Sequence, residues 1–461
     1  MTRFVWLLLA LWSLSCSTAS ETENGTDTAD SDVLADTVSA TDSVSIDTTD
    51  TIDGTGVPAV MNQFPWAGES VDETCSNGVD DDDNGYADCD DFGCARNLAV
   101  FVCGAKASFE NSPTDCANGQ DDDGDGRVDC DDPDCARNPF HDVCPPIVHE
   151  TVCDDGKDND QDGFTDCDDF DCKLLAQSCT DAPRVLFDQT LDETGSGSPN
   201  ADWIMDAWGR LPFPSNPTKS GDWVGSLSTF GFQLHQAGYL VENLPSWNGK
   251  ITWEDTDNPQ DLTHYDVVIL FEPSRQIDPI EQGALLHFVL AGGGLLMVGN
   301  HQGADRDGNG WTASGAFNDL MTNNNVQADP FGFAFDQADI DTGAPITSIP
   351  DPSSPLVDGP FGTVNAIGFY DGDSAHLTGT NPDAIGVLFH DNAADDASNI
   401  VVGLSQAGEG RVVFVTDSAI GGDGTDSHGE ALQYKDSWDN ANQNNDSLFL
   451  NAVAFLAGKS N

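Results

Sequence analysis

Basic residues are scarce in this chain. Only 16 of its 461 residues are lysine or arginine, against 80 aspartates and glutamates, so the formal net charge is −64. We therefore expect no nucleic acid as a partner, because its phosphates would be repelled. Divalent cations are the partners that this charge favours, although strong acidity also occurs in disordered tails and in adaptation to high salt.

Cysteine is absent from the C-terminal part of the chain. The last of the 13 cysteines is Cys179, so residues 182–461 contain none. A thiol nucleophile is therefore excluded in that part. No G-x-S-x-G motif supplies a serine nucleophile in its place.

Long apolar runs are also missing. "FVWLLLALW" (4–12) follows Arg3 and is too short to span a bilayer, so residues 1–19 are predicted to be an export signal. "SLSC" (13–16) resembles a bacterial lipoprotein box with Cys16 as the lipidated residue, with serine where that family usually has leucine. Cleavage after "STA" (17–19) is the alternative and would discard Cys16. We expect an exported protein: an outer-membrane lipoprotein or cell-surface protein attached to the membrane only by that lipid, or else a secreted one.

Residues 20–70 are rich in Ser, Thr and Asp and contain few large apolar side chains. Such a segment cannot bury enough surface to offset its ordering entropy. We expect a disordered acidic tether here.

Residues 71–181 contain three repeats, 71–110, 111–148 and 149–181. Each has four cysteines, and the first three keep separations of 14 and then 5 residues in every repeat. This regularity indicates a tandem small domain. Twelve cysteines in an exported chain predict two disulfides per repeat, with the pairing left open.

Each repeat also contains a run of aspartates, such as "DDDGDGRVDCDD" (121–132). Oxygen ligands fall at loop positions 1, 3, 5, 9 and 12, and a glycine stands at position 6, as in a twelve-residue EF-hand-type calcium loop. The predicted metal ligands are Asp80, Asp82, Asn84, Asp88 and Asp91; Asp121, Asp123, Asp125, Asp129 and Asp132; and Asp158, Asp160, Asp162, Asp166 and Asp169.

A bound cation explains this crowding of charge. Five carboxylates around one point repel one another by roughly tens of kcal/mol, more than the roughly 5–15 kcal/mol that keeps a domain folded. Oxygen ligands of this number suit calcium better than magnesium or zinc. We expect about three calcium ions, with loops held by disulfides rather than by helix pairs; a merely solvated acidic surface is the alternative.

The repeats resemble the Asp- and Cys-rich metal-binding repeats of bacterial surface proteins and, more loosely, thrombospondin type 3 repeats. That resemblance implies calcium. Some proteins with related repeats are associated with copper, so another divalent metal stays open.

Residues 182–461 alternate apolar runs with helical segments. The runs include "RVLFDQ" (184–189), "YDVVILFEP" (265–273), "GLLMVGNH" (294–301), "AIGVLFH" (384–390), "NIVVGLS" (399–405) and "RVVFVTDS" (411–418), with helices expected over 278–294 and 444–458. Continuous apolar strands between helices predict an α/β fold whose parallel sheet is covered on both faces. The order of elements resembles the class I glutamine-amidotransferase-like fold, particularly its ThuA-like relatives, with Asn300 and His301 where that family has its cysteine.

Polar residues are expected together at the carboxyl ends of these strands, where open parallel sheets place their ligands. They are Asp188, Glu272, His301, Asp305 and Asp417. His301 can move a proton while Asp305 and Asp417 hold a metal, which gives these three residues tentative catalytic roles. The alternative is that the residues cap helices and satisfy turns. "DRDGNG" (305–310) imitates only the first half of a calcium loop.

Five tryptophans, Trp203, Trp208, Trp223, Trp247 and Trp253, crowd residues 200–255 and either stack on sugars or pack in the core. The sequence therefore favours an exported calcium-binding surface protein whose amidotransferase-like domain binds an extracellular ligand, a carbohydrate or another small molecule. An exported metal-dependent hydrolase is the alternative.

Overall fold

The computed structural model describes residues 72–79, 87–90, 94, 100–103, 112–122, 127–136, 141–145, 150, 152–161, 163–175, 179–193, 203–206, 217–246, 249–305, 309–390, 397–425 and 437–458. All of them belong to one compact unit, Val57–Asn461. The predicted export signal, Cys16 and the predicted tether lie outside these residues. Among the helices described, none has the length and apolar composition needed to cross a membrane.

Six disulfides cross-link the repeats, two in each. The first cysteine of each repeat pairs with the third, in Cys75–Cys94, Cys116–Cys135 and Cys153–Cys172. The second pairs with the fourth, in Cys89–Cys103, Cys130–Cys144 and Cys167–Cys179. The prediction of two disulfides per repeat is confirmed, and such a framework is typical of exported proteins.

Short helices recur at the same place in each repeat. The second cysteine lies in a 3-10 helix, Asp88–Asp90, Asp129–Asp131 or Asp166–Asp168, and a further one spans Asp115–Ala117. The α-helices α2 (Pro133–Ala136) and α3 (Phe170–Leu175) are the longest ones described here. Within the described part of the repeats, the disulfides and turns therefore carry the structure, as expected.

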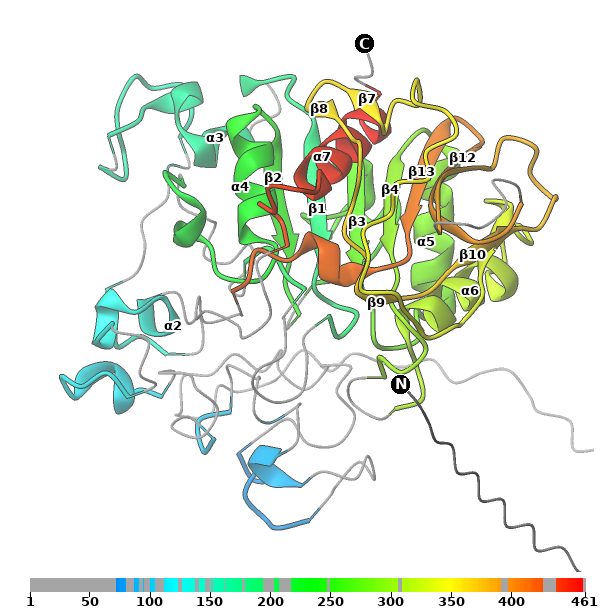
Figure 1. The fold of residues 1–461 in the computed structure, drawn as a ribbon. Coiled ribbons are helices and arrows are strands. Elements are labelled where there is room, and N and C mark those ends of the chain that lie inside the picture. Colours follow the sequence, from blue (N-terminus) through cyan, green and yellow to red (C-terminus); the bar gives the residue numbers. More distant parts are fainter. Residues whose placement is uncertain are drawn as a thin grey trace, which may run out of the picture. The chain divides into compact units, whose positions relative to one another are not determined.

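A nine-stranded sheet forms the centre of the C-terminal domain (Figure 1), in the order β2-β1-β3-β4-β13-β12-β10-β5, with β11 also paired to β12. Five strands are mutually parallel: β1 (Arg184–Asp188), β2 (Leu240–Leu244), β3 (Val267–Phe271), β4 (Gly294–Val298) and β13 (Gly410–Val415). β2, β3 and β4 are buried along their whole length. The α/β prediction is confirmed.

The remaining strands are antiparallel, so the sheet is mostly parallel, as predicted, with an antiparallel side. They are β5 (Phe333–Phe335), β10 (Ala375–Leu377), β11 (Ile385–Phe389) and β12 (Ile400–Ala407). Only two residues join β12 to β13, and Gly408 there has φ +60°. A connection of that length permits only a hairpin, because a parallel crossover needs a dozen residues or more.

Helices cover both faces of the sheet. α4 (Ser228–Gln236) and α7 (Asn445–Leu456) pack on the face to which Val185 and Phe187 point. α5 (Pro279–Leu290) and α6 (Ala313–Asn323) pack on the opposite face, with Leu186. Asp278 caps α5 by accepting hydrogen bonds from the Ile280 and Glu281 amides, as its place before the apolar run predicts. Short 3-10 helices span Ser220–Asp222, Leu262–His264 and Ser418–Gly421.

Two small strand pairs follow α6 in the chain. β6 (Ile340–Asp341) pairs with β9 (Asp371–Gly372), and β7 (Asp358–Gly359) pairs with β8 (Gly362–Thr363). The amide of Asp373 donates to the carbonyl of Thr416, 2.8 Å away, just beyond the carboxyl end of β13. The β6–β9 pair therefore lies at the edge of the sheet where the polar residues were expected.

The third repeat contacts the sheet domain directly. Phe170 and Leu174 pack against Leu240 of β2, and the Phe170 ring meets the His235 ring edge-on at 5.1 Å. Arg184, at the start of β1, donates to the carbonyl of Leu174 over 3.1 Å. The third repeat is thus packed on the domain that follows it.

Candidate functional site

The aspartate at loop position 9 braces each repeat. Asp88, Asp129 and Asp166 adopt φ values of +54°, +49° and +49°. Both carboxylate oxygens of each accept hydrogen bonds from the amide of the glycine ten residues earlier, at 2.9–3.2 Å. These three predicted ligands therefore close a turn of the repeat, and their role towards a metal stays a prediction.

Three carboxylates meet in the third repeat: those of Glu150, Asp160 and Asp169. Each offers one oxygen, and these oxygens lie within 4.8 Å of one another. Glu150 also accepts the amides of Asn159 and Asp166, both at 2.8 Å, so it fixes the loop from its two ends. Asp160 and Asp169 were predicted as ligands at loop positions 3 and 12. Glu150 was not, because it precedes the first cysteine of its repeat and lies outside the loop spacing.

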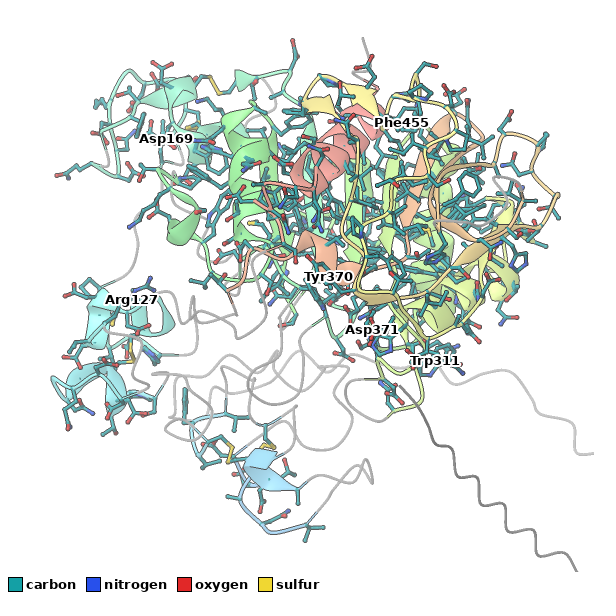
Figure 2. All side chains as sticks on the ribbon, in the orientation of Figure 1. Arg127, Asp169, Trp311, Tyr370, Asp371 and Phe455 are labelled. Atoms are coloured by element: carbon teal, nitrogen blue, oxygen red, sulfur yellow. A yellow bond between two sulfur atoms is a disulfide. The ribbon has the colours of Figure 1, made fainter. Side chains whose placement is uncertain are left out.

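The aspartate at loop position 12 is buried in both repeats where it is described. Asp132 and Asp169 are each 1 % exposed, and Glu150 is 0 % exposed (Asp169 is labelled in Figure 2). Burying ionised carboxylates costs several kcal/mol per group unless positive charge or hydrogen bonds compensate. A cation placed among Glu150, Asp160 and Asp169 would supply that charge.

The other predicted ligands divide into two groups. Asp158 accepts the amides of Gln161 and Gly163 at 2.7 and 3.2 Å, which shapes the start of the third loop, and Asp121 lies exposed at the start of the second. Asp80, Asp82, Asn84, Asp91, Asp123, Asp125 and Asp162 lie outside the described residues.

His301 follows β4 and meets two aspartates from the β6–β9 region. Its Nε2 lies 3.7 Å from Oδ2 of Asp371, and its Nδ1 lies 4.0 Å from Oδ1 of Asp339. One ligand atom from each of the three residues falls within 4.8 Å of the others, an arrangement that can hold a metal ion. The sequence singled out His301 but not Asp339 or Asp371, which lie 38 and 70 residues further along the chain. Figure 2 labels Asp371 at this edge of the domain.

The proton of the His301 ring is assigned by a backbone contact. The Gly303 amide donates to Nδ1 over 3.1 Å, so Nδ1 accepts and a neutral ring carries its proton on Nε2, facing Asp371. A metal ion on Nε2 would require the other tautomer. Metal binding there must therefore break the Gly303 contact and shift the 302–304 turn.

Asp417 lies behind this group. It is fully buried, and its two oxygens accept the amides of Tyr370 and Ala419 at 2.7 and 2.9 Å. Burial, together with the nearby carboxylates of Glu272 and Asp371, raises the pKa of Asp417 to about 7. Asp417 thus acts as the cap and turn residue that the structural alternative described, and its direct contact with a metal stays a prediction.

Glu272 lies close to Asp417 and is hydrogen-bonded to the residue that follows it. It follows β3 with φ +55°, an uncommon conformation for a side chain of this size, and Ser418 donates a short hydrogen bond to its carboxylate. Strained positions of this kind cluster at functional sites. Glu272 and Asp371 both lie near Asp417, and Asp371 also lies beside His301, so these predicted residues share one region.

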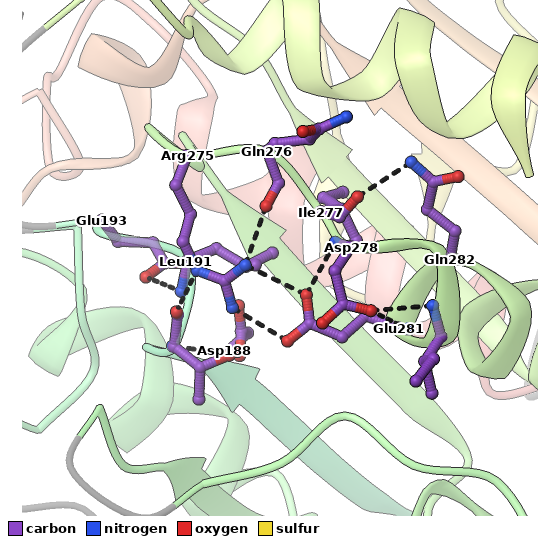
Figure 3. Close-up of polar contacts among 11 residues, drawn as sticks. Asp188, Leu191, Glu193, Arg275, Gln276, Ile277, Asp278, Glu281 and Gln282 are labelled. Carbon is purple, nitrogen blue, oxygen red and sulfur yellow. Dashed lines mark hydrogen bonds and ion pairs between the residues drawn. The ribbon is translucent and has the colours of Figure 1, made fainter. Parts of the chain in front are cut away.

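Asp188 belongs to a different group, at the end of β1 (Figure 3). Its Oδ1 accepts the amide and hydroxyl of Thr190 at 3.1 and 2.8 Å, and Glu193 accepts the Leu191 amide at 3.0 Å. Burial raises the pKa of Asp188, and burial with the neighbouring Asp188 charge raises the pKa of Glu193 well above its usual range. Among the described residues, no hydrogen bond or ion pair joins Asp188 to His301.

Asp305 does not join the His301 group either. Its Oδ2 accepts the Gly310 amide at 3.0 Å, which closes the "DRDGNG" turn. Residues 306–308 of that turn lie outside the described part of the chain.

The described members of this tryptophan group pack against other apolar side chains. Trp203 and Trp223 are 5 % and 1 % exposed and belong to the core under α4 and α7. Trp253 packs against Phe288 of α5, and Trp208 and Trp247 lie outside the described residues. Stacking on sugars is therefore wrong for Trp203 and Trp223.

Comparisons with known proteins find similarity among solved structures only. No protein-family model matches the chain, and no curated protein matches it. Solved structures do. A cytoplasmic protein of Salmonella typhimurium is 14 % identical, covers 59 % of this chain and 98 % of its own, and gives a TM-score of 0.36. A ThuA-like protein from Bacteroides uniformis is 10 % identical, with 61 % and 94 % covered and a TM-score of 0.32. The mmIFT52 N-terminal domain is also 10 % identical, with 59 % and 96 % covered and a TM-score of 0.37.

Proposed function

We propose that this is an exported, calcium-binding surface protein whose repeats present the α/β domain to an extracellular ligand. Attachment to the outer membrane or cell surface through a lipid on Cys16 is part of the proposal, with secretion as the alternative route. The six disulfides support export.

The observation that carries calcium binding is the group of Glu150, Asp160 and Asp169 in the third repeat. Two of its three carboxylates are buried, and disulfides at Cys167 and Cys172 close the loop that carries Asp160 and Asp169. Oxidised cysteines cannot serve as soft thiolate ligands, and the three ligands described here are carboxylate oxygens. Calcium takes six to eight such oxygens in flexible geometry, whereas magnesium requires a tight octahedron. Another hard divalent cation is the alternative.

Calcium titration of chelator-stripped protein by isothermal calorimetry tests this proposal. We expect uptake of about three ions per chain if all three loops bind. Asp160→Asn and Asp169→Asn should remove one ion or weaken it at least tenfold, about 1.4 kcal/mol. Asp154→Asn removes the same charge from an exposed neighbouring position and should leave the titration unchanged. Absence of uptake at millimolar calcium would refute the proposal.

A metal-dependent hydrolase is the second candidate function. It is favoured by His301 beside Asp371 and Asp339, with the buried Asp417 behind them. In that function the aspartates would hold the metal and His301 would contribute a ligand or move a proton.

The hydrolase is tested with Mn²⁺ or Zn²⁺ and the nitrophenyl esters of acetate and phosphate. His301→Ala and Asp371→Asn should each abolish turnover and metal uptake at this site without lowering the melting temperature. His287→Ala alters an exposed histidine of α5 and is the matched control. Turnover that persists in both site variants would exclude this function.

A further inference from the structure

A polar hollow lies beside α6, and neither His301 nor the aspartates around it line the hollow. Its volume is about 400 Å³, at the small end of ligand pockets, which span about 300–1,000 Å³. It is formed where the chain leaves β4 and enters α6, and its walls include Gln302, Asp305, Trp311, Thr312, Asp319 and Gln337. Its position beyond the carboxyl end of β4 is where open α/β sheets bind ligands.

Asp305 belongs to this wall and has one carboxylate oxygen without a donor. Its Oδ2 is held by the Gly310 amide at 3.0 Å, whereas its Oδ1 is shielded from solvent and accepts no hydrogen bond from the described residues. A buried carboxylate oxygen without a donor costs free energy, so such an atom calls for a donor from outside the protein. A ligand hydroxyl would supply it once a turn of the Asp305 side chain brings Oδ1 to the hollow.

The other side chains of the hollow have complementary chemistry. Trp311 is partly buried against the core under α6, and Gln302 and Gln337 expose primary amides. Asp319, in contrast, is occupied by the side-chain amides of Gln276, Gln282 and Asn323. The groups left for a ligand are therefore one carboxylate oxygen, two amides and an indole ring.

The side chains of the hollow disfavour anions and apolar ligands. No lysine, arginine or histidine occurs among the described residues of the wall, and Asp305 and Asp319 make it acidic, so anions are disfavoured. Amides and carboxylates do not suit an apolar ligand. Hydroxyl groups, which donate and accept, suit the carboxylate and both amides, while the ring provides an apolar face.

We propose that the hollow binds one neutral sugar unit of an extracellular glycan. Asp305 accepts from ring hydroxyls, Gln302 and Gln337 bond the neighbouring hydroxyls, and Trp311 packs on the apolar face of the sugar. This inference rests on the part of the proposed function in which the α/β domain binds an extracellular ligand, and it names the class of that ligand.

Saturation-transfer difference NMR with maltose, cellobiose and N,N′-diacetylchitobiose tests the proposal on the whole protein. We expect at least one of them to bind at millimolar concentration. Trp311→Ala and Asp305→Asn should each weaken that binding at least tenfold, about 1.4 kcal/mol. Trp311→Phe keeps an aromatic ring and should retain part of the affinity, which separates loss of stacking from loss of folding. Glucuronate should bind more weakly than the neutral sugars.

Trp253→Phe and Asp383→Asn make the matching changes outside the hollow and should leave sugar binding intact. The calcium titrations of Asp160→Asn and Asp169→Asn report on the third repeat, which lies outside the hollow, so failure of either proposal is seen independently of the other. The sugar proposal is overturned if none of the three disaccharides binds, if binding survives both Trp311→Ala and Asp305→Asn, or if glucuronate binds best.

Discussion

Single aspartates with the same spacing have different roles in this protein. The loop pattern predicted ligands at positions 3 and 12, and in the third repeat Asp160 and Asp169 do come together with Glu150. The pattern also assigned position 9 to the metal; Asp166 there closes a backbone turn, and its role towards a metal stays a prediction. Spacing shows where a carboxylate falls along the chain, but the direction of its oxygens depends on the backbone, here a positive φ.

We therefore predict that Asp166→Asn and Asp169→Asn behave differently. Asn has a single acceptor oxygen, so Asp166→Asn should cost about 1–3 kcal/mol of stability in the third repeat, equally with calcium and with chelator. Asp169→Asn should reduce stability mainly when calcium is present. Hydrogen exchange at the Gly156 amide measures both effects. An Asp166→Asn cost that vanishes in chelator would instead assign Asp166 to the metal.

The buried Asp188–Glu193 pair predicts a pH dependence of stability. The folded state raises the pKa of Glu193 above its usual 4.5, so it binds more protons than the unfolded chain above that pH. The free energy of unfolding should then fall as pH rises from about 4.5 towards the folded-state pKa. Glu193→Gln can still accept from Leu191 and can donate to Asp188, and it no longer titrates, so it should lessen this fall.

Denaturant unfolding between pH 4 and pH 9 measures that difference. Glu409→Gln removes an exposed carboxyl from the β12–β13 turn and should follow the wild-type curve. A Glu193→Gln curve parallel to the wild type would show that the pair is not titrating.

At the scale of elements, continuous apolar runs predicted where the strands lie, but not whether each strand is parallel or antiparallel to its neighbours. β1, β3, β4 and β13 were found because each is an uninterrupted apolar run buried on both faces. β11 and β12 look the same in sequence, yet they are antiparallel, because direction is set by the length of the connections. α6 was not predicted, since "ASGAFNDLMTN" is polar over much of its surface.

The position of Asp339 depends on hydrogen bonds to Asp373, a residue more than 30 positions away, which no local sequence pattern predicts. Asp373 is fully buried; its Oδ1 accepts the Ala338 amide at 2.7 Å and the Ser374 amide at 2.8 Å, and its Oδ2 accepts the Gln337 amide at 3.0 Å. One side chain thus ties the segment before β6 to the segment after β9. It thereby places Asp339 and Asp371 on the same side of His301.

We predict that Asp373→Asn loosens this connection. An asparagine oxygen cannot serve both groups of amides, so the variant should lose about 1–3 kcal/mol of stability and exchange the Gln337 and Ala338 amides faster. Asp341→Asn, an exposed change in β6, is the control. Unchanged exchange at Gln337 in Asp373→Asn would contradict the bracing role.

At the scale of the whole molecule, two parts of the chain are stabilised differently: the repeats by disulfides and the sheet domain by an apolar core. All six disulfides lie within the repeats, whereas the sheet domain has no cysteine and a continuous apolar core. A closed loop of about 15 residues contributes about 3 kcal/mol, which is large for units of this size. The composition correctly predicted disulfides in residues 71–181, although it could not predict the pairing of the cysteines.

Reduction should therefore affect one part of the protein only. With reductant and chelator together, we expect the repeats to become sensitive to protease while the tryptophan emission of the sheet domain stays unchanged. Residues 71–181 contain no tryptophan, so that emission does not report on the repeats. A parallel loss of both signals would show that the domain depends on the third repeat, whose Phe170 packs against it.

The central claim is that divalent ions compensate the clustered carboxylates of the repeats. The most direct measurement is an anomalous-difference map from crystals grown in millimolar calcium without chelator. We predict a peak about 2.3–2.6 Å from oxygens of Glu150, Asp160 and Asp169, the distance typical of calcium. A map without a peak among these three residues, while their carboxylates stay as close together, would contradict the account.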